Sequence, residues 1–176
     1  MPSRIWARLT PTGPRSDEVN LHPFAKAWEA RDLDRLLALL SDDVVFHSPF
    51  VGEPGFEGRD PTAVIFTIAL TSLEDVRFTH GFGDDRSHVL VATAAVSEKP
   101  IKSTTLLEFD DEGKIREIWM MIRPLTGLAA LAEAVGRAIE SRDPSVYELA
   151  KPLVGLAADI DRTAGRLVDD LNRSTA

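Results

Sequence analysis

The sequence has no cysteine, which excludes disulfide bonds and thiolate catalysis. Its four histidines are scattered without the spacing of zinc ligands, so we expect neither a metal nor a cofactor. Acidic residues outnumber basic ones by 28 to 20, and the resulting charge of −8 argues against binding to nucleic acid or to an anionic membrane surface. The sequence also lacks an apolar run of the roughly 20 residues that cross a bilayer. We therefore expect a cytoplasmic protein with no nucleic acid partner and no membrane insertion.

The length of 176 residues allows one domain with a substantial core, together with appendages. Residues 1–17 hold three prolines and no apolar periodicity, which predicts a flexible N-terminal arm. Residues 18–140 are expected to form the domain, and residues 141–176 a C-terminal helical extension. An apolar stripe from Val146 to Leu171 indicates that this extension packs on the domain, on a second subunit or over a cavity as a lid, with Pro152 kinking or dividing it.

The apolar periodicity changes along the domain. Leucines recur at steps of three and four from Leu33 to Leu40, which predicts a short amphipathic helix, and the β-branched and aromatic run from Val44 to Phe46 then favours a strand. Further helices are predicted at residues 18–31, from Asp60 onward and at residues 125–141. From residue 74 the period becomes two, which predicts four strands at residues 76–82, 88–96, 101–109 and 114–123. This order indicates an α+β fold with helices covering one face of a curved antiparallel sheet.

Four stretches of the chain carry a resemblance to a known family. They are AWEARDLDRLLALLSDDVVFHSP at residues 27–49, FEGRD at 56–60, LLEFDDEGKIREI at 106–118 and IRPL at 122–125. Together they resemble the nuclear transport factor 2-like superfamily, in its SnoaL-like and ketosteroid-isomerase-like branch. The resemblance implies a cone-shaped curved antiparallel sheet wrapped by N-terminal helices around an apolar cavity, commonly in a homodimer.

The resemblance can be followed residue by residue into the ketosteroid isomerases. Their proton-shuttling aspartate corresponds to Ser48, their enolate-stabilising tyrosine to Phe24 and their protonated aspartate to Thr105. All three roles have therefore changed, which argues against steroid isomerisation by that mechanism. The strand face assigned to the cavity carries no carboxylate, and the residues expected to bind a ligand there and around it are Phe24, Trp28, Phe50, Ser103, Thr105, Leu107, Ile118, Met120 and Ile122.

The catalytic candidates are His47 and Ser48, which end the first strand just before Pro49. An imidazole at the mouth of the cavity is suited to general base catalysis, although a structural histidine bonded to a neighbouring carbonyl is the alternative. Ser48 either orients that ring or a ligand, or caps the turn at Pro49. His80 falls by alternation on the apolar side of its strand, which favours a core or interface position.

Two classes of function remain open from the sequence. The first is a SnoaL-like protein that binds a small apolar molecule of steroid, terpene or polyketide type, with isomerase, cyclase or dehydratase-like acid–base activity. The second is a non-catalytic ligand carrier or a dimeric assembly module. Trp119 and Met121 alternate away from the assigned cavity, which predicts a homodimer formed through the outer face of the sheet.

Overall fold

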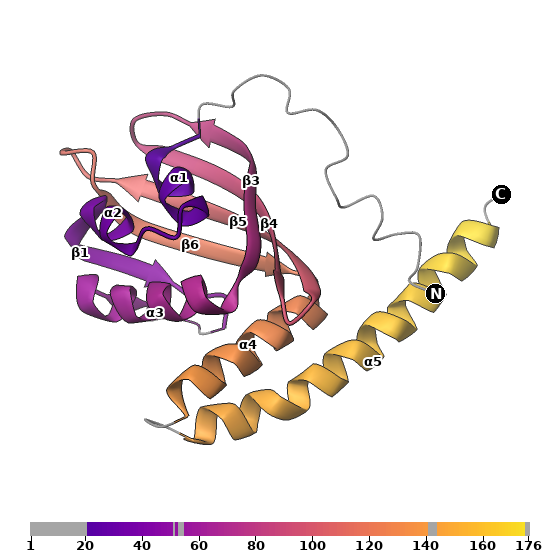
Figure 1. Cartoon of the computed structure of the whole chain (residues 1–176). Helices are drawn as coiled ribbons and strands as arrows, with labels where there is room; N and C mark the ends of the chain where they lie inside the picture. Colours follow the sequence, from indigo (N-terminus) through magenta and orange to yellow (C-terminus); the bar gives the residue numbers. More distant parts are fainter. Residues whose placement is uncertain (1–20, 51, 53–54, 141–143, 175–176) are drawn as a thin grey trace.

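The computed structural model describes residues 21–50, 52, 55–140 and 144–174, so the expected arm at residues 1–17 lies outside the described residues. Within these ranges the elements alternate as helices, strand, helix, meander and helices (Figure 1). The helices are α1 (Pro23–Glu29), α2 (Leu33–Ala38), α3 (Arg59–Ser72), α4 (Leu125–Ile139) and α5 (Pro144–Ser174). The strands are β1 (Leu40–His47), β2 (Phe56–Glu57), β3 (Glu74–Gly83), β4 (Ser87–Val96), β5 (Lys99–Phe109) and β6 (Ile115–Arg123).

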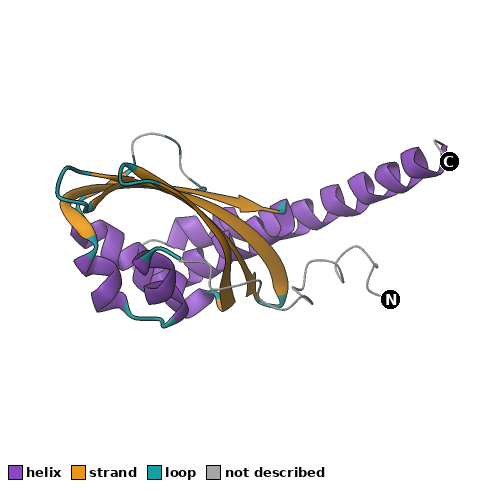
Figure 2. Cartoon of the chain, turned by 90° about the horizontal axis from the view of Figure 1, so that it is seen from above, coloured by secondary structure: helices purple, strands orange, loops and turns teal. Residues whose placement is uncertain are grey.

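The strands form one curved sheet (Figure 2). Their order across the sheet is β2-β1-β6-β5-β4-β3. Strands β3 to β6 are antiparallel neighbours, as their short connections predict. Strand β1 instead runs parallel to β6, with Phe46 beside Ile118. The predicted α+β class is confirmed, and the sheet is mixed because one helix and four strands, rather than a tight turn, connect β1 to β6.

The starts of the helices follow local chemistry. Pro23 lies in the first turn of α1, and Nδ1 of His22 accepts a hydrogen bond from the Phe24 amide at 3.2 Å. Asp32 caps α2 through the Arg35 amide at 3.0 Å, as its position in the sequence predicts. Helix α3 begins one residue before the predicted start at Asp60, because Gly58 takes the cap position with a φ of +90° that residues with a side chain rarely adopt.

Strand β3 departs from simple alternation. Its register with β4 shifts between Phe78 and His80, so the residues beyond this point exchange faces. His80 and Phe82 consequently lie on the exposed side, with their rings stacked at 5.9 Å. The prediction that His80 shares the apolar side of the strand with Phe78 is therefore wrong, because periodicity alone does not reveal the extra residue of a bulge.

Helices α1, α2 and α3 lie on the concave side of the curved sheet (Figure 2). They meet the inner faces of the strands in one hydrophobic core, where Phe24, Leu36 and Phe66 are at most 1% exposed. Leu40, at the end of the predicted leucine stripe, is also fully buried. Each such side chain contributes roughly 1.5–3 kcal/mol to folding, so the helices are fixed to the sheet mainly by these contacts.

Helix α4 packs against the sheet, and α5 packs along α4 before projecting past the domain (Figure 1). Pro152 does not divide α5, which runs as one helix through it. Ala157 is only 2% exposed, whereas Leu153, Leu156 and Ile160 are 46–56% exposed. The predicted apolar stripe is therefore covered only in part within the described chain. None of the described helices is long and apolar enough to cross a membrane.

Candidate functional site

The inner face of the sheet is the surface to which the sequence assigned a ligand. Thr105 on β5 lies in register with Leu90 on β4 and Met120 on β6, and Leu107 lies beside Ile118. Residues in register share a face, so these side chains form one continuous surface. The Thr105 hydroxyl is thus held among apolar groups, and Thr105 itself is 2% exposed.

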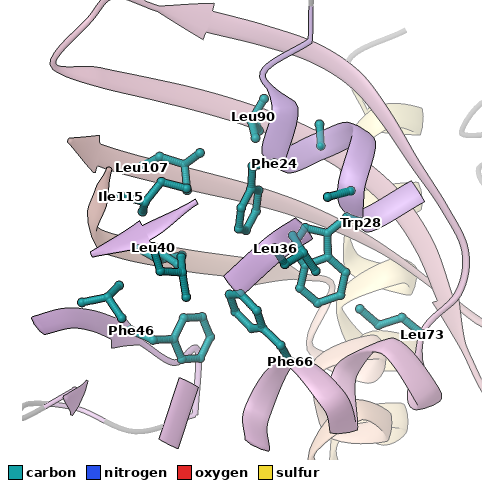
Figure 3. Packing of buried hydrophobic residues seen from close by; sticks show 14 of the residues in the cluster. Phe24, Trp28, Leu36, Leu40, Phe46, Phe66, Leu73, Leu90, Leu107 and Ile115 are labelled. Atoms are coloured by element: carbon teal, nitrogen blue, oxygen red, sulfur yellow. The ribbon is translucent and has the colours of Figure 1, made fainter. Parts of the chain in front are cut away.

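Aromatic rings from the helices fill much of the space in front of this surface. Phe24 and Trp28 on α1 make edge contacts with each other at 6.1 Å and with Phe66 on α3 at 6.0 and 5.3 Å (Figure 3). Phe46 on β1 reaches the same Phe66 ring at 5.9 Å. Four of the predicted ligand-binding residues are therefore members of the packed core at 3% exposure or less, namely Phe24, Trp28, Leu107 and Ile118. Thr105 is a buried polar residue at 2% exposure.

Three other predicted ligand-binding residues lie farther along the same face. Ser103 pairs with Ile122 across β5 and β6. Met120 lies two residues before Ile122 on the same face, in register with Thr105. All three are partly exposed, and the two apolar ones pack against the edge of the core. This part of the inner face can be reached from outside the core, unlike the part around Leu107.

The predicted catalytic residues do not join this surface. His47 lies in register with Trp119, and its ring is stacked on that indole at 3.4 Å. Its Nε2 is 3.5 Å from the Glu117 carboxylate, which also accepts a hydrogen bond from the Trp119 indole N–H at 3.1 Å. Because Phe46, one residue earlier, points into the core, His47 points to the opposite face of the sheet. The expectation that His47 stands at the mouth of an inner cavity is therefore not met.

The residues next to His47 form a turn. The Ser48 hydroxyl accepts a hydrogen bond from the Phe50 amide at 3.2 Å, which matches the alternative prediction that serine caps the turn at Pro49. Phe50 is 39% exposed and does not belong to the core cluster. The structure thus separates His47, Ser48 and Phe50 from the remaining predicted site residues.

Two histidines that the sequence did not single out meet on the inner face. His88 on β4 lies in register with the buried Leu107, and its ring centroid is 5.5 Å from that of His22, the cap residue of α1. The Phe109 ring lies 5.1 Å from His22 on the other side. Burial, together with the positive charge that His88 can carry, lowers the pKa of His22 to about 4. The alternation of His88 with Leu90 and Ala92 was the available signal for its inward position.

A pocket of about 210 Å³ lies elsewhere, between the end of α1 and the start of β3. The Arg31 guanidinium there donates to the Leu70 and Leu73 carbonyls, and Glu29 accepts a hydrogen bond from the Phe78 amide at 2.8 Å. These bonds hold α1, α3 and β3 together, so the polar lining has a structural purpose. Across the described ranges, no group of three histidine, aspartate or glutamate side chains is placed to hold a metal ion.

Comparison with known proteins agrees with this architecture. A family model for a SnoaL-like domain matches residues 21–118, which is more than half of the chain, and the protein belongs to this family. The resemblance to the nuclear transport factor 2-like superfamily is thereby confirmed. A comparison with curated protein sequences found no match.

Two solved structures illustrate the relationship. A steroid delta-isomerase from Pseudomonas aeruginosa is 35% identical, with a TM-score of 0.62 over 67% of this chain and 87% of the other. An uncharacterised bacterial protein with a cystatin-like fold from Silicibacter pomeroyi is 22% identical, with a TM-score of 0.63 over 73% of this chain and 91% of the other. The second likeness concerns the fold alone.

Proposed function

We propose that this protein binds a small, mainly apolar molecule of steroid, terpene or polyketide type on the inner face of its sheet. The observation that carries the proposal is the position of the Thr105 and Ser103 hydroxyls within an otherwise apolar surface. Such a surface contributes most of its binding energy by burying ligand area, while a few polar groups fix the orientation. The 35% identity with a steroid delta-isomerase supports a ligand of this class.

The proposed ligand occupies the partly exposed end of the face, formed by Ser103, Met120 and Ile122. Its far end reaches toward the core at Thr105. Binding there displaces few packed aromatic rings, because Phe24, Trp28 and Phe66 contact one another deeper in the molecule. The core residues then act as the floor of the site.

Ligand binding is the primary function in this proposal, and acid–base turnover is secondary. The positions that correspond to the ionisable groups of ketosteroid isomerases hold Phe24, Ser48 and Thr105, none of which transfers protons readily at neutral pH. The inner face of β4, β5 and β6 carries no carboxylate at its register positions. Any isomerase, cyclase or dehydratase-like step on this face depends on a histidine side chain. If the protein catalyses no such step, it is a ligand carrier.

We also propose a homodimer through the outer face of the sheet. Trp119 and Met121 are 36% and 54% exposed and lie on one side of β6. Two large apolar side chains on a sheet face favour association, since burying them against a second copy removes them from water.

Native mass spectrometry of the purified protein tests the binding proposal. We expect a co-purifying small molecule that is retained under gentle ionisation and released by denaturation. The released molecule, incubated with fresh protein, then shows whether it is converted or only bound. A protein that carries no molecule and takes up none from an organic extract of its host cells would contradict the proposal.

A further inference from the structure

His22 and His88 form a pair of polar rings at one end of the otherwise apolar inner face. They come from different elements, the cap of α1 and strand β4, and their ring centroids are 5.5 Å apart with planes inclined by 41°. The neighbours of the pair are apolar, with Phe109 beside His22 and the buried Leu90 two residues from His88. Two imidazoles in such surroundings are an unusual use of an inward position.

The hydrogen bond at the start of α1 fixes the tautomer of His22. Its Nδ1 accepts the Phe24 amide proton at 3.2 Å, so this nitrogen must carry its lone pair. Burial keeps the ring neutral near pH 7, with the pKa of His22 lowered to about 4. The single ring proton therefore lies on Nε2, and His22 offers a neutral N–H donor from a fixed position.

His88 supplies the complementary nitrogen. Its Nε2 is buried and has no hydrogen-bond partner among the described residues. Buried polar groups in folded proteins are nearly always paired, and the exceptions deserve a functional explanation. A methyl group added at Gly81 would lie 3.1 Å from this nitrogen and 3.2 Å from Leu90 Cδ2. Because Gly81 on β3 has no side chain, the His88 ring fits against that strand.

From this geometry we infer that His22 and His88 together bind one oxygen atom, a hydroxyl or a carbonyl, of an apolar molecule held at their own partly exposed end of the inner face. The inference rests on the proposed function for the chemical class of the ligand, but it concerns a separate position, because the buried Leu90 and Thr105 lie between His88 and Ser103. The Nε2–H of His22 donates to the oxygen, and Nε2 of His88 makes the second hydrogen bond as donor or acceptor. The pair selects oxygenated molecules from hydrocarbons of the same shape.

Three rigid terpenes of nearly equal shape provide the probes: borneol has a hydroxyl, camphor has a carbonyl and bornane has neither. Their dissociation constants are measured by protein-observed NMR titration. In the wild-type protein we expect borneol and camphor each to bind about tenfold more tightly than bornane. In His22→Asn, which keeps a side-chain cap for α1, and in His88→Phe, which keeps an aromatic ring, this preference should fall to about twofold or less, while the affinity for bornane stays unchanged.

His80→Asn is the matched control, because His80 is an exposed histidine on the opposite face and its loss should leave all three affinities unchanged. A second measurement uses the wild-type protein alone and follows the nitrogen chemical shifts of its imidazole rings. Addition of borneol should change the chemical shifts of both His22 Nε2 and His88 Nε2. Equal binding of the three probes, or a preference that survives both substitutions, would overturn the role of the pair and leave apolar binding intact. Failure of all three probes to bind would overturn the proposed function as well.

Discussion

The imidazole of His47 lies flat on the indole of Trp119, with ring centroids 3.4 Å apart and planes 7° from parallel. The two residues are register partners on β1 and β6, so the stack crosses the parallel strand pair on its outer face. Glu117 binds to both rings, at 3.5 Å from His47 Nε2 and 3.1 Å from the Trp119 nitrogen. This arrangement makes His47 a residue of the outer surface and separates it from Thr105.

Replacing His47 by alanine should therefore leave ligand binding on the inner face unchanged. We expect dissociation constants for borneol within about twofold of the wild type, since no hydrogen bond to the ligand is lost. The fluorescence of Trp119 should change because the stacked ring is removed. A large loss of binding or turnover in His47→Ala would restore His47 to the functional site.

The outer face should mediate dimerisation. The double variant Trp119→Asp and Met121→Asp places two charges where a second copy would exclude water, so we expect a folded monomer in solution scattering. A matched variant, Leu156→Asp on the exposed side of α5, should leave the dimer intact if the interface is confined to the sheet. A wild-type protein that is already monomeric at micromolar concentration would contradict the interface.

The contact between α4 and β5 should tolerate no extra atom. A methyl group at Gly127 would overlap Ile101 Cγ2 and lie 3.1 Å from the Pro100 carbonyl oxygen, so Gly127→Ala should lower the free energy of unfolding by about 1–3 kcal/mol. Gly155→Ala is the control, because no described residue would lie within 4 Å of a methyl group at that position on α5. Its effect should be a gain of about 0.5–1 kcal/mol from helix propensity. Chemical denaturation measures both, and equal effects would contradict the close approach of α4.

The depressed pKa of His22 predicts a loss of stability in mild acid. The folded state holds this ring neutral down to about pH 4, whereas the unfolded chain protonates it near its ordinary value of 6.5. Stability from this group is complete above pH 6.5 and declines as the pH falls toward 4, because only the unfolded state takes up the proton. His22→Asn should lessen this decline, because the number of protons taken up on unfolding falls by up to one. The measurement is the difference in unfolding free energy between pH 7 and pH 5. Identical slopes in wild type and variant would show that His22 is not held neutral.

The sequence predicted most elements of this fold because their causes are local. The steps of three and four from Leu33 to Leu40 follow from a helix with one buried face, and Leu36 and Leu40 are buried as expected. The hairpin after Phe109 is equally local, since Asp110 accepts hydrogen bonds from the Glu112 and Lys114 amides and Gly113 takes a φ of +75°.

The candidate site was harder to predict because its geometry is not local. The direction of His47 depends on the pairing of β1 with β6, whose register partners are 72 to 75 residues apart in the sequence, such as Phe46 with Ile118 and His47 with Trp119. The bulge beyond Phe78 has no signal in the periodicity of β3. His22 and His88 meet only because α1 folds onto the concave side of the sheet, so neither residue is conspicuous in the sequence by itself.

The central claim, that a small apolar molecule binds the inner face of the sheet, can be tested at two adjacent methionines. Met120 faces inward beside Thr105, whereas Met121 is 54% exposed and pairs with Thr104 on the other face. With the methionine methyl groups isotopically labelled, the protein gives three methyl signals, from Met1, Met120 and Met121. Titration with borneol should shift the Met120 methyl signal in a saturable manner and leave that of Met121 in place. A shift of Met121 without one of Met120, or no shift of either up to the solubility of borneol, would contradict the claim.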